Sequence, residues 1–283
     1  MFVPKEGLKP SDEVLKKFGV QEDLQLLNGG LKRCFKAGDI VLKHFQDTSE
    51  VEASWLPNLL NSIESTKFRV QKYLKSKDGR YIEEGWVAYY FLPGNHVKGR
   101  LPEKRRALEA FHKELKDVPR PPHLIENRND PWTMADRMVW DEIPLNCHKR
   151  ILNAIQDLVK LRGPLRITNQ LIQGDPNHIL FSETEPPALI DLSWCWRPAD
   201  FSLAILVADY LICWCKDECD CLPRSEVVAV FEDVKYFKQL LIRAVLRRAL
   251  ELEGLRKFNE RFLYEIDNHI PAINFVYDYV SQS

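Results

Sequence analysis

Hydrophobic and polar positions alternate with a period of two residues along most of the first third of the chain. This alternation predicts β-strands, whose side chains point to opposite faces in turn. The runs cover residues 23–28, 31–36, 40–45, 68–75 and 81–92. Asp78-Gly79, between the last two runs, is typical of a β-hairpin turn. One helix interrupts this β-rich segment and is expected to begin near Glu50.

After Pro93-Gly94 the pattern changes to longer apolar stretches that predict helices. The expected helices cover residues 102–115, 145–161, 201–215, 224–253 and 257–279. A short helix is also expected near the start, where Ser11 precedes two acidic residues. A β-rich part followed by a helical part predicts an α+β fold with two lobes. We expect the lobes to comprise residues 1–92 and 93–283.

One β-element is expected within the helical part. Two short apolar runs, at 178–181 and 188–192, flank a polar loop that contains two prolines. This arrangement predicts a β-hairpin in which Ile179 lies across from Ile190. Asp175 and Asn177 before the hairpin would then share its open end with Asp191 after it.

Two carboxylates and an amide at one end of a hairpin are suitable ligands for Mg²⁺ and the phosphates of a nucleotide. One carboxylate can hold the metal while the other orients an attacking hydroxyl. Pro176 disfavours a helical conformation for Asp175 and keeps this acid on an extended loop. Two structural alternatives remain, because Asp-Pro-Asn is a common turn and Asp191 could cap a turn.

The run at 40–45 places Val41 and Lys43 on one face of a strand. A lysine between apolar neighbours needs an anionic partner or a route to solvent. Lys43 could therefore hold phosphate groups, or it could extend into water from an edge strand. Glu52 in the next helix could pair with Lys43, with Glu50 as a substitute, or it could only complete a capping box with Ser49 at the helix start.

Gly29 and Gly30 lie between two of the predicted strands. Glycines allow a backbone to approach phosphate oxygens closely, but they also form simple hairpin turns. The sequence is consistent with both interpretations.

Composition narrows the possible functions. The 283 residues include 40 basic and 41 acidic side chains, so the formal net charge is −1 and a nucleic-acid or anionic-membrane partner is not expected. The apolar run at 201–215 is too short to cross a bilayer, and the start of the chain has no pattern of a secretory signal.

Seven cysteines favour a reducing compartment, with the cytoplasm expected. Their Cys-x-Cys spacing near residues 213–221 differs from that of zinc ribbons, so core thiols are favoured there.

Several of these segments together resemble the aminoglycoside phosphotransferase and choline-kinase-like family of small-molecule kinases. The resemblance covers most of the chain, and it extends to an uncharacterised branch that has Trp-Arg-Pro after the second aspartate. The matching segments are Gly29-Gly30, residues 39–43, 52–55, 85–94, Gly174-Asp175, residues 188–193 and Trp196-Arg197-Pro198.

The resemblance implies a protein-kinase-like fold that binds ATP and Mg²⁺. It makes Lys43 the phosphate-binding lysine and Glu52 its partner. It also implies that Asp175 is the catalytic base and Asp191 the main Mg²⁺ ligand. Tyr89, Tyr90, Phe91 and Leu92 would contact adenine, with Val41 packing on the base.

The chain departs from the family pattern at the catalytic loop. Gln173 stands where the family usually has histidine, and the loop that follows is shorter. The metal-binding asparagine would be Asn177, or His178 would replace it, or this ligand is lost. Imidazole is a poor ligand for Mg²⁺, so Asn177 is preferred.

The sequence therefore predicts an ATP-dependent phosphotransferase that acts on a hydroxyl of a small molecule. The alternative is a kinase-fold protein that binds a nucleotide or a protein partner without turnover.

Overall fold

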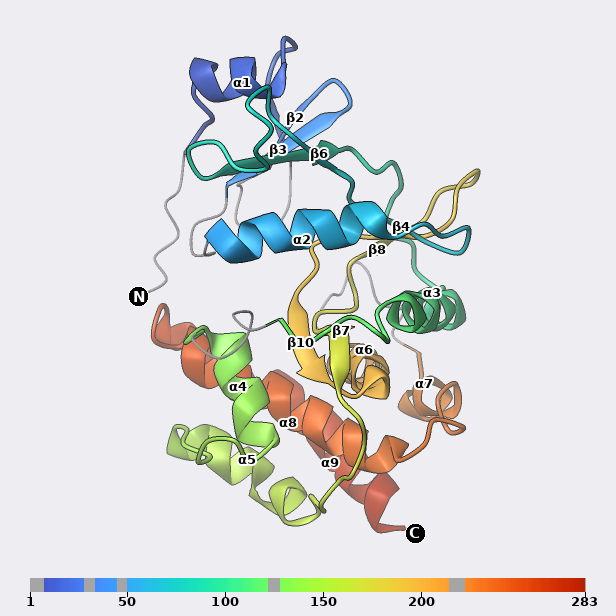
Figure 1. The fold of residues 1–283 in the computed structure, drawn as a ribbon. Helices are drawn as coiled ribbons and strands as arrows, with labels where there is room; N and C mark the ends of the chain where they lie inside the picture. Colours follow the sequence, from blue (N-terminus) through green and yellow to red (C-terminus); the bar gives the residue numbers. More distant parts are fainter. Residues whose placement is uncertain (1–7, 28–33, 45–49, 122–127, 214–221, 283) are drawn as a thin grey trace. The chain divides into compact units, whose positions relative to one another are not determined.

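The computed structural model describes residues 8–27, 34–44, 50–121, 128–213 and 222–282, without the side chains of residues 50–53 (Figure 1). The chain forms two compact units. Unit 1 comprises residues 1–95 and 180–190, and unit 2 comprises residues 96–179 and 191–283. The hairpin segment 180–190 therefore belongs with unit 1, whereas the sequence assigned it to residues 93–283. The reason is a parallel strand pair, in which Arg69 faces Ala188 and Val70 faces Leu189.

Unit 1 contains a five-stranded sheet with the strand order β1-β2-β3-β6-β5. The register places Val41 opposite Tyr89 and Lys43 opposite Val87. The strands are β1 (Gln25–Leu26), β2 (Cys34–Ala37), β3 (Ile40–His44), β5 (Tyr73–Leu74) and β6 (Trp86–Tyr90). The alternating runs of the sequence thus form strands, most of them shorter than the runs themselves.

One face of this sheet packs on helix α1 (Asp12–Phe18). Ser11 begins this helix as predicted, since its hydroxyl accepts a hydrogen bond from the amide of Val14 over 3.3 Å. Phe18 of the helix and Leu42 of β3 belong to the same apolar cluster. Side chains alternate along a strand, so Val41 and Lys43 lie on the opposite face, as the sequence predicted.

Helix α2 (Glu50–Ser62) begins where the sequence predicted it. Lys72 closes its C-terminal end by donating hydrogen bonds to the carbonyl oxygens of Leu60, at 2.8 Å, and of Asn61 and Ile63. These carbonyls have no partner within a helix, so the ammonium stabilises the last turn.

A three-stranded sheet has the order β4-β9-β8. It consists of β4 (Arg69–Val70), β8 (Ile179–Leu180) and β9 (Ala188–Leu189). The pairing of β8 with β9 confirms that the two predicted apolar runs lie side by side, and Ile190 follows directly after β9. Arg69 reinforces the sheet with hydrogen bonds to the Pro186 carbonyl and the Glu185 carboxylate.

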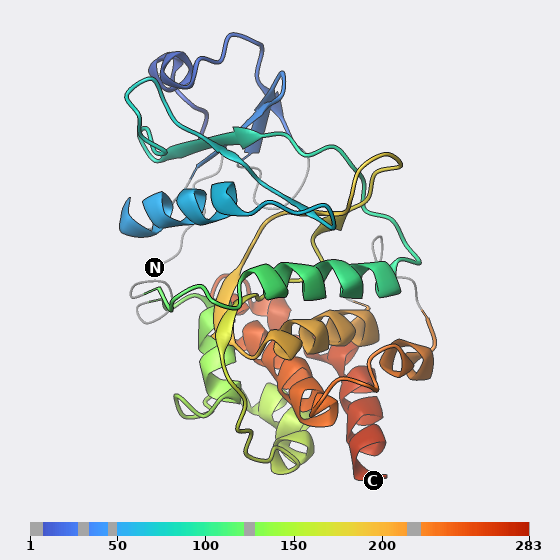
Figure 2. The same cartoon turned by 45° about the vertical axis from the view of Figure 1, so that its right-hand side comes forward.

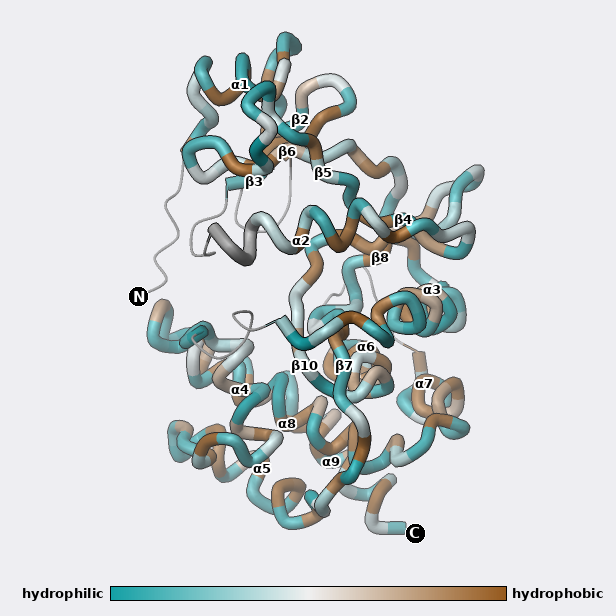
Figure 3. Tube along the Cα trace, in the orientation of Figure 1, coloured by the Kyte–Doolittle hydropathy of each residue, from teal (hydrophilic) through white to brown (hydrophobic). Residues whose placement is uncertain are grey.

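Unit 2 is mainly helical, and Figure 2 shows α3 lying along α6. Its apolar helix α6 is buried along nearly its whole length and packs on α8. In α5, by contrast, only one face is buried, and brown and teal alternate along it in Figure 3. The helices are α3 (Leu101–Glu114), α4 (Pro131–Val139), α5 (Lys149–Lys160), α6 (Ala199–Ile212), α7 (Arg224–Ala229), α8 (Phe237–Leu255), the 3₁₀ helix η1 (Glu260–Leu263) and α9 (Ile266–Ser281).

Three features of unit 2 differ from the sequence predictions. The helix expected over 224–253 is split into α7 and α8, because Tyr236 takes a left-handed conformation with φ 60°. The helix expected over 257–279 is likewise divided into η1 and α9. Helix α4 was not predicted, although Asp130 caps it and Pro131 occupies its first turn.

Unit 2 also contains a two-stranded antiparallel ribbon that the sequence did not predict. Strand β7 (Gln170–Gln173) pairs with β10 (Trp194–Arg197), and Gln173 faces Trp194. Three of the four residues of each strand are buried, so neither shows a clear alternation of polar and apolar residues. Within the described part of the chain, no helix has the length and apolarity needed to cross a bilayer.

Candidate active site

The two predicted aspartates lie at the same end of the β7–β10 ribbon. Asp175 follows β7 by two residues, and Asp191 precedes β10 by three. The side chain of Gln173 joins the two segments, because its Oε1 accepts hydrogen bonds from the amide of Ser193, at 2.6 Å, and from that of Asp175, at 3.4 Å. Gln173 is 1% exposed. Gln173 is therefore a buried connector between the two acidic loops.

Gly174 brings the two strands close together at this end. Its amide donates to the Ser193 carbonyl over 2.5 Å. A Cβ at this position would lie 2.5 Å from Sγ of Cys195 and 3.1 Å from the Ser193 oxygen. Because this close approach leaves no room for a side chain, only glycine fits here without rearrangement.

Two side chains hold the Asp175 carboxylate. Arg248 of α8 donates from Nη2 to Oδ1 over 2.9 Å, and Nε2 of His178 lies 3.2 Å from Oδ2. Burial acts to raise the pKa of the Asp175 carboxyl, but Arg248 and His178 outweigh it and hold that pKa well below its usual range. Asp175 is therefore ionised at neutral pH, and its oxygens are fixed in direction.

Arg248 itself is part of a buried ionic network. Its guanidinium donates to Asp209 over 2.6 and 2.8 Å and to Glu251 over 3.1 and 3.3 Å. Burial lowers the pKa of Arg248, but the three surrounding carboxylates outweigh this and raise it well above its usual value. Asp209 is buried and reaches the loop through Arg248.

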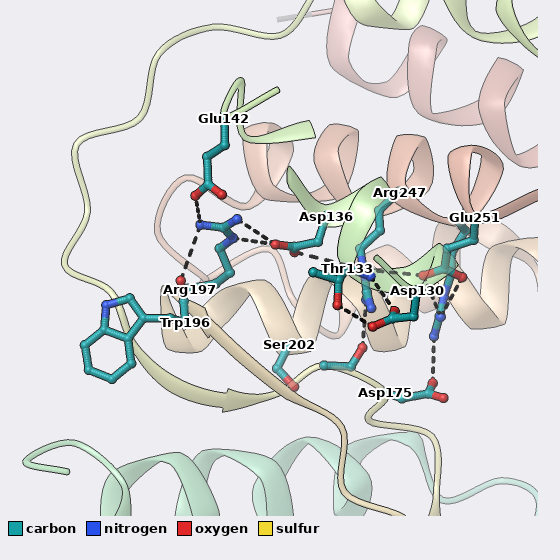
Figure 4. A network of polar contacts seen from close by, with 12 residues as sticks. Asp130, Thr133, Asp136, Glu142, Asp175, Trp196, Arg197, Ser202, Arg247 and Glu251 are labelled. Carbon is teal, nitrogen blue, oxygen red and sulfur yellow. Dashed lines mark hydrogen bonds and ion pairs between the residues drawn. The ribbon is translucent and has the colours of Figure 1, made fainter. Parts of the chain in front are cut away.

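The neighbouring Arg247 fixes the peptide before Asp175. It donates from Nη1 to the Gly174 carbonyl over 2.7 Å and is 1% exposed. The network continues through Glu251 and Asp136 to Arg197, which lies between Asp136 and Glu142 in Figure 4. Two consecutive arginines of α8 thus hold the Gly174-Asp175 segment from within unit 2.

Asn177 is turned into the interior of unit 2. Its side chain is 1% exposed, and its Oδ1 accepts a hydrogen bond from Nζ of Lys104 over 2.6 Å. Lys104 belongs to α3 and is also 1% exposed. The amide oxygen that the sequence assigned to Mg²⁺ is therefore bound to a buried ammonium.

Asp191 is exposed and takes a left-handed backbone conformation with φ 47°. Aspartate tolerates this conformation better than most residues, and such backbone strain is common at functional sites. Among the described residues, no group of three or more His, Cys, Asp or Glu side chains is arranged to hold a metal. Mg²⁺ often binds through one or two carboxylates together with substrate phosphates. The carboxylate of Asp191 is a suitable ligand for Mg²⁺. The amide oxygen of Asn177 is not, because it is bound to the ammonium of Lys104.

The residues predicted to bind the nucleotide base and phosphates lie in unit 1. Val41 and Tyr89 are buried opposite each other on β3 and β6, and Lys43 is half-buried on the same face as Val41. Tyr90 is 51% exposed. Phe91 donates from its backbone amide to the Asp39 carbonyl over 2.8 Å, and Leu92 is half-buried.

Four predictions concern residues outside the described part. Gly29, Gly30 and Ser49 belong to the undescribed segments, and Glu52 lies in α2 without a described side chain. In the cysteine-rich segment, Cys213 ends α6, and the cysteines that follow it are likewise outside the description. Asp200 lies in the first turn of that helix, and Pro198 occupies the cap position.

The sequence pattern did not identify the cationic residues around Asp175 and Asn177, which are Lys104, Arg247 and Arg248. The arginine pair is the only consecutive pair of charged residues between Ala244 and Leu250, in an otherwise apolar stretch of α8. Charged groups at buried helical positions need partners of opposite charge. That pattern indicated an internal ion network, although it did not identify Asp175 as a member.

No protein-family model and no curated protein matches the sequence. The structure, however, is similar to solved structures of phosphotransferases. The AMP-bound complex of spectinomycin phosphotransferase APH(9)-Ia aligns with a TM-score of 0.59 and 14% identity, covering 94% of this chain and 96% of that one. A choline/ethanolamine kinase family protein from Mesorhizobium loti aligns with a TM-score of 0.52 and 11% identity, covering 94% of both chains.

Aminoglycoside phosphotransferase APH(4)-Ia is a further structural neighbour, with a TM-score of 0.53, 13% identity and coverage of 92% of this chain and 97% of that one. These alignments extend over both units. The chain therefore has the α+β fold of these phosphotransferases, which confirms the predicted fold class and structural resemblance.

Proposed function

We propose that this protein is an ATP-dependent phosphotransferase that moves the γ-phosphate to a hydroxyl group of a small molecule. The observation that supports this most is the position of Asp175 and Asp191 at one end of the β7–β10 ribbon. The fold adds support, because the structurally similar spectinomycin phosphotransferase APH(9)-Ia has been solved with AMP, and with ADP and spectinomycin.

Asp175 would orient the acceptor hydroxyl. In phosphoryl transfer through a loose transition state, positioning contributes more than strong base catalysis. An aspartate whose pKa is held well below its usual range remains ionised and directs its oxygens, although it is a weak base. Asp191 would hold Mg²⁺, which neutralises charge on the nucleotide phosphates when it is bound.

In unit 1, Lys43 would bind phosphate oxygens and Glu52 would pair with it. Val41 and residues 89–92 would contact the base, and Gly29-Gly30 would approach the phosphates.

We propose a small hydroxylated molecule as the acceptor, with no nucleic-acid or membrane partner, and the cytoplasm as the compartment. Spectinomycin binding belongs to the neighbour and does not define the acceptor here.

The test combines a binding assay with a turnover assay. Thermal unfolding with and without ADP and Mg²⁺ measures nucleotide binding, and release of ADP from ATP is then followed with a panel of hydroxylated metabolites. We expect Asp175→Asn to bind ADP as the native protein does and to lose turnover by about 10²–10⁴-fold. Unchanged turnover in a folded Asp175→Asn variant would refute the assignment.

A second candidate function is nucleotide binding without turnover. The contacts of Asp175 favour it, because both carboxylate oxygens already have side-chain partners in Arg248 and His178. The acceptor hydroxyl would have to share or displace one of these partners. This candidate predicts a melting shift with ADP but no ADP release with any acceptor, and the same nucleotide affinity for native protein and Asp175→Asn.

A further inference from the structure

Lys104 and Asn177 form a buried polar pair. Nζ of Lys104 and Oδ1 of Asn177 are 2.6 Å apart, and each side chain is 1% exposed. An ammonium that is removed from water requires strong acceptors close by. The Asn177 oxygen supplies one, and the ring of Tyr210 lies 5.4 Å from the same ammonium.

A divalent cation could not share this oxygen at low cost. It would approach within a few ångströms of the Lys104 ammonium, where like charges in a poorly hydrated interior repel strongly. Neither side chain is exposed, so solvent would not screen this repulsion. The interior position of the pair therefore opposes metal binding at Asn177.

The other alternative ligand is also engaged. His178 contacts Asp175 through Nε2 at 3.2 Å, and imidazole is a poor ligand for Mg²⁺. Of the three predicted metal ligands, Asp191 is the exposed carboxylate. A single carboxylate binds Mg²⁺ weakly on its own, but it is sufficient when nucleotide phosphates complete the coordination.

We propose that Lys104 takes the place of a metal ion at Asn177, so that metal binds only together with the nucleotide and only through Asp191. The part that concerns Asp191 rests on the proposed function, whereas the part that concerns Lys104 does not. Asn177 is then a positioning residue, which fixes the loop after Asp175 to helix α3.

The metal part is tested by electron paramagnetic resonance of Mn²⁺, titrated with the full-length protein in the absence and presence of ADP. The main variant is the double substitution Lys104→Met with Asn177→Leu, which replaces the pair by apolar side chains of similar size. A second variant, Asn177→Asp, keeps a partner for Lys104. Asp191→Asn is the comparison that removes the assigned ligand.

We expect free Mn²⁺ to bind weakly and Mn²⁺ with ADP to bind more tightly. The double variant and Asn177→Asp should keep the affinity for Mn²⁺ and ADP within about twofold, whereas Asp191→Asn should lose at least about tenfold. A tenfold loss in a folded double variant, or a tenfold gain in Asn177→Asp, would show that Asn177 faces the metal and would overturn the proposal.

A second measurement tests the Lys104 part without nucleotide or metal. Each single variant, Lys104→Met and Asn177→Leu, removes one member of the pair and leaves the other buried polar group with one hydrogen bond fewer. Both should therefore melt at lower temperature than the double variant, which lacks both groups. If the decreases in melting temperature of the two single variants add up in the double variant, the proposed pairing of Lys104 with Asn177 is overturned. If the native protein binds no Mn²⁺ with ADP, the proposed function fails, and this melting comparison still decides whether Lys104 holds Asn177.

Discussion

Arg248 and Asp175 are 73 residues apart in the sequence, yet Nη2 of the arginine lies 2.9 Å from Oδ1 of the aspartate. The same guanidinium binds Asp209 and Glu251. The orientation of the candidate catalytic carboxylate is therefore determined by a helix that contributes no predicted site residue.

Replacement of Arg248 by methionine leaves three carboxylates without their shared cation. Because Asp209 and Glu251 are each 3% exposed, we expect a loss of about 3–5 kcal/mol in the free energy of unfolding, measured by urea denaturation. The pKa of Asp175 should also rise, which ¹³C NMR of its carboxyl carbon can follow.

The matched control is Arg150→Met, which breaks the exposed pair with Asp267. Exposed ion pairs contribute about 1 kcal/mol or less, so this variant should be nearly as stable as the native protein. Equal losses in the two variants would contradict a special role for the buried network.

His112 predicts a dependence of stability on pH. Its Nε2 accepts a hydrogen bond from the Gln173 amide over 3.2 Å, and burial lowers the pKa of the imidazole to about 3. Between its ordinary pKa of 6.5 and about 3, the unfolded chain binds a proton that the folded chain does not. The buried His112 therefore does not lower the free energy of unfolding above pH 6.5. Below that pH, the free energy of unfolding falls by about 1.4 kcal/mol per pH unit.

His112→Gln, which keeps an acceptor but does not titrate, should reduce the pH slope of the unfolding free energy by that amount between about pH 6 and 4.5. A smaller slope should persist, because burial also lowers the pKa of His269 to about 4. Denaturation curves at a series of pH values provide the measurement. An identical slope in the variant and the native protein would show that His112 is protonated in the fold.

Gly174→Ala tests the close approach of the two strands at the site. The added Cβ would meet Sγ of Cys195 at 2.5 Å, and we expect a loss of about 1–3 kcal/mol in urea denaturation. Adding Cys195→Ala removes that sulfur, so the double variant should lose less than the sum of the two single variants. Gly163→Ala is the control, because its nearest neighbour would be 3.6 Å away. Additive losses at Gly174 and Cys195 would refute the steric explanation.

Lys72→Met tests the closure of helix α2 in unit 1. The substitution removes an ammonium that donates to the carbonyls of Leu60 and Asn61, and we expect a loss of about 1–2 kcal/mol. Hydrogen exchange should become faster in the last turn of α2. Lys67→Met, at an exposed position five residues earlier, should leave both stability and exchange unchanged. Unchanged exchange in Lys72→Met would mean that water replaces the ammonium at these carbonyls.

The sequence by itself determined the local elements. Alternation with a period of two identified the strands around Val41 and Tyr89, and Ser11 marked the first helix correctly. The hairpin at 179–190 was also identifiable, because a polar loop between two short apolar runs is typical of a β-hairpin. From that hairpin the sequence predicted that Asp175 and Asp191 would lie at a common end.

Only the tertiary structure decided which groups surround those aspartates. Lys104 meets Asn177 and Arg248 meets Asp175, each across 73 residues of sequence. The strand β10 was missed for a related reason, since burial on both faces removes the alternation that identifies a strand. Local patterns depend on neighbouring residues along the chain, whereas the partner of a buried charge depends on which distant helices pack around it, and the energetic need for a partner does not specify which residue supplies it.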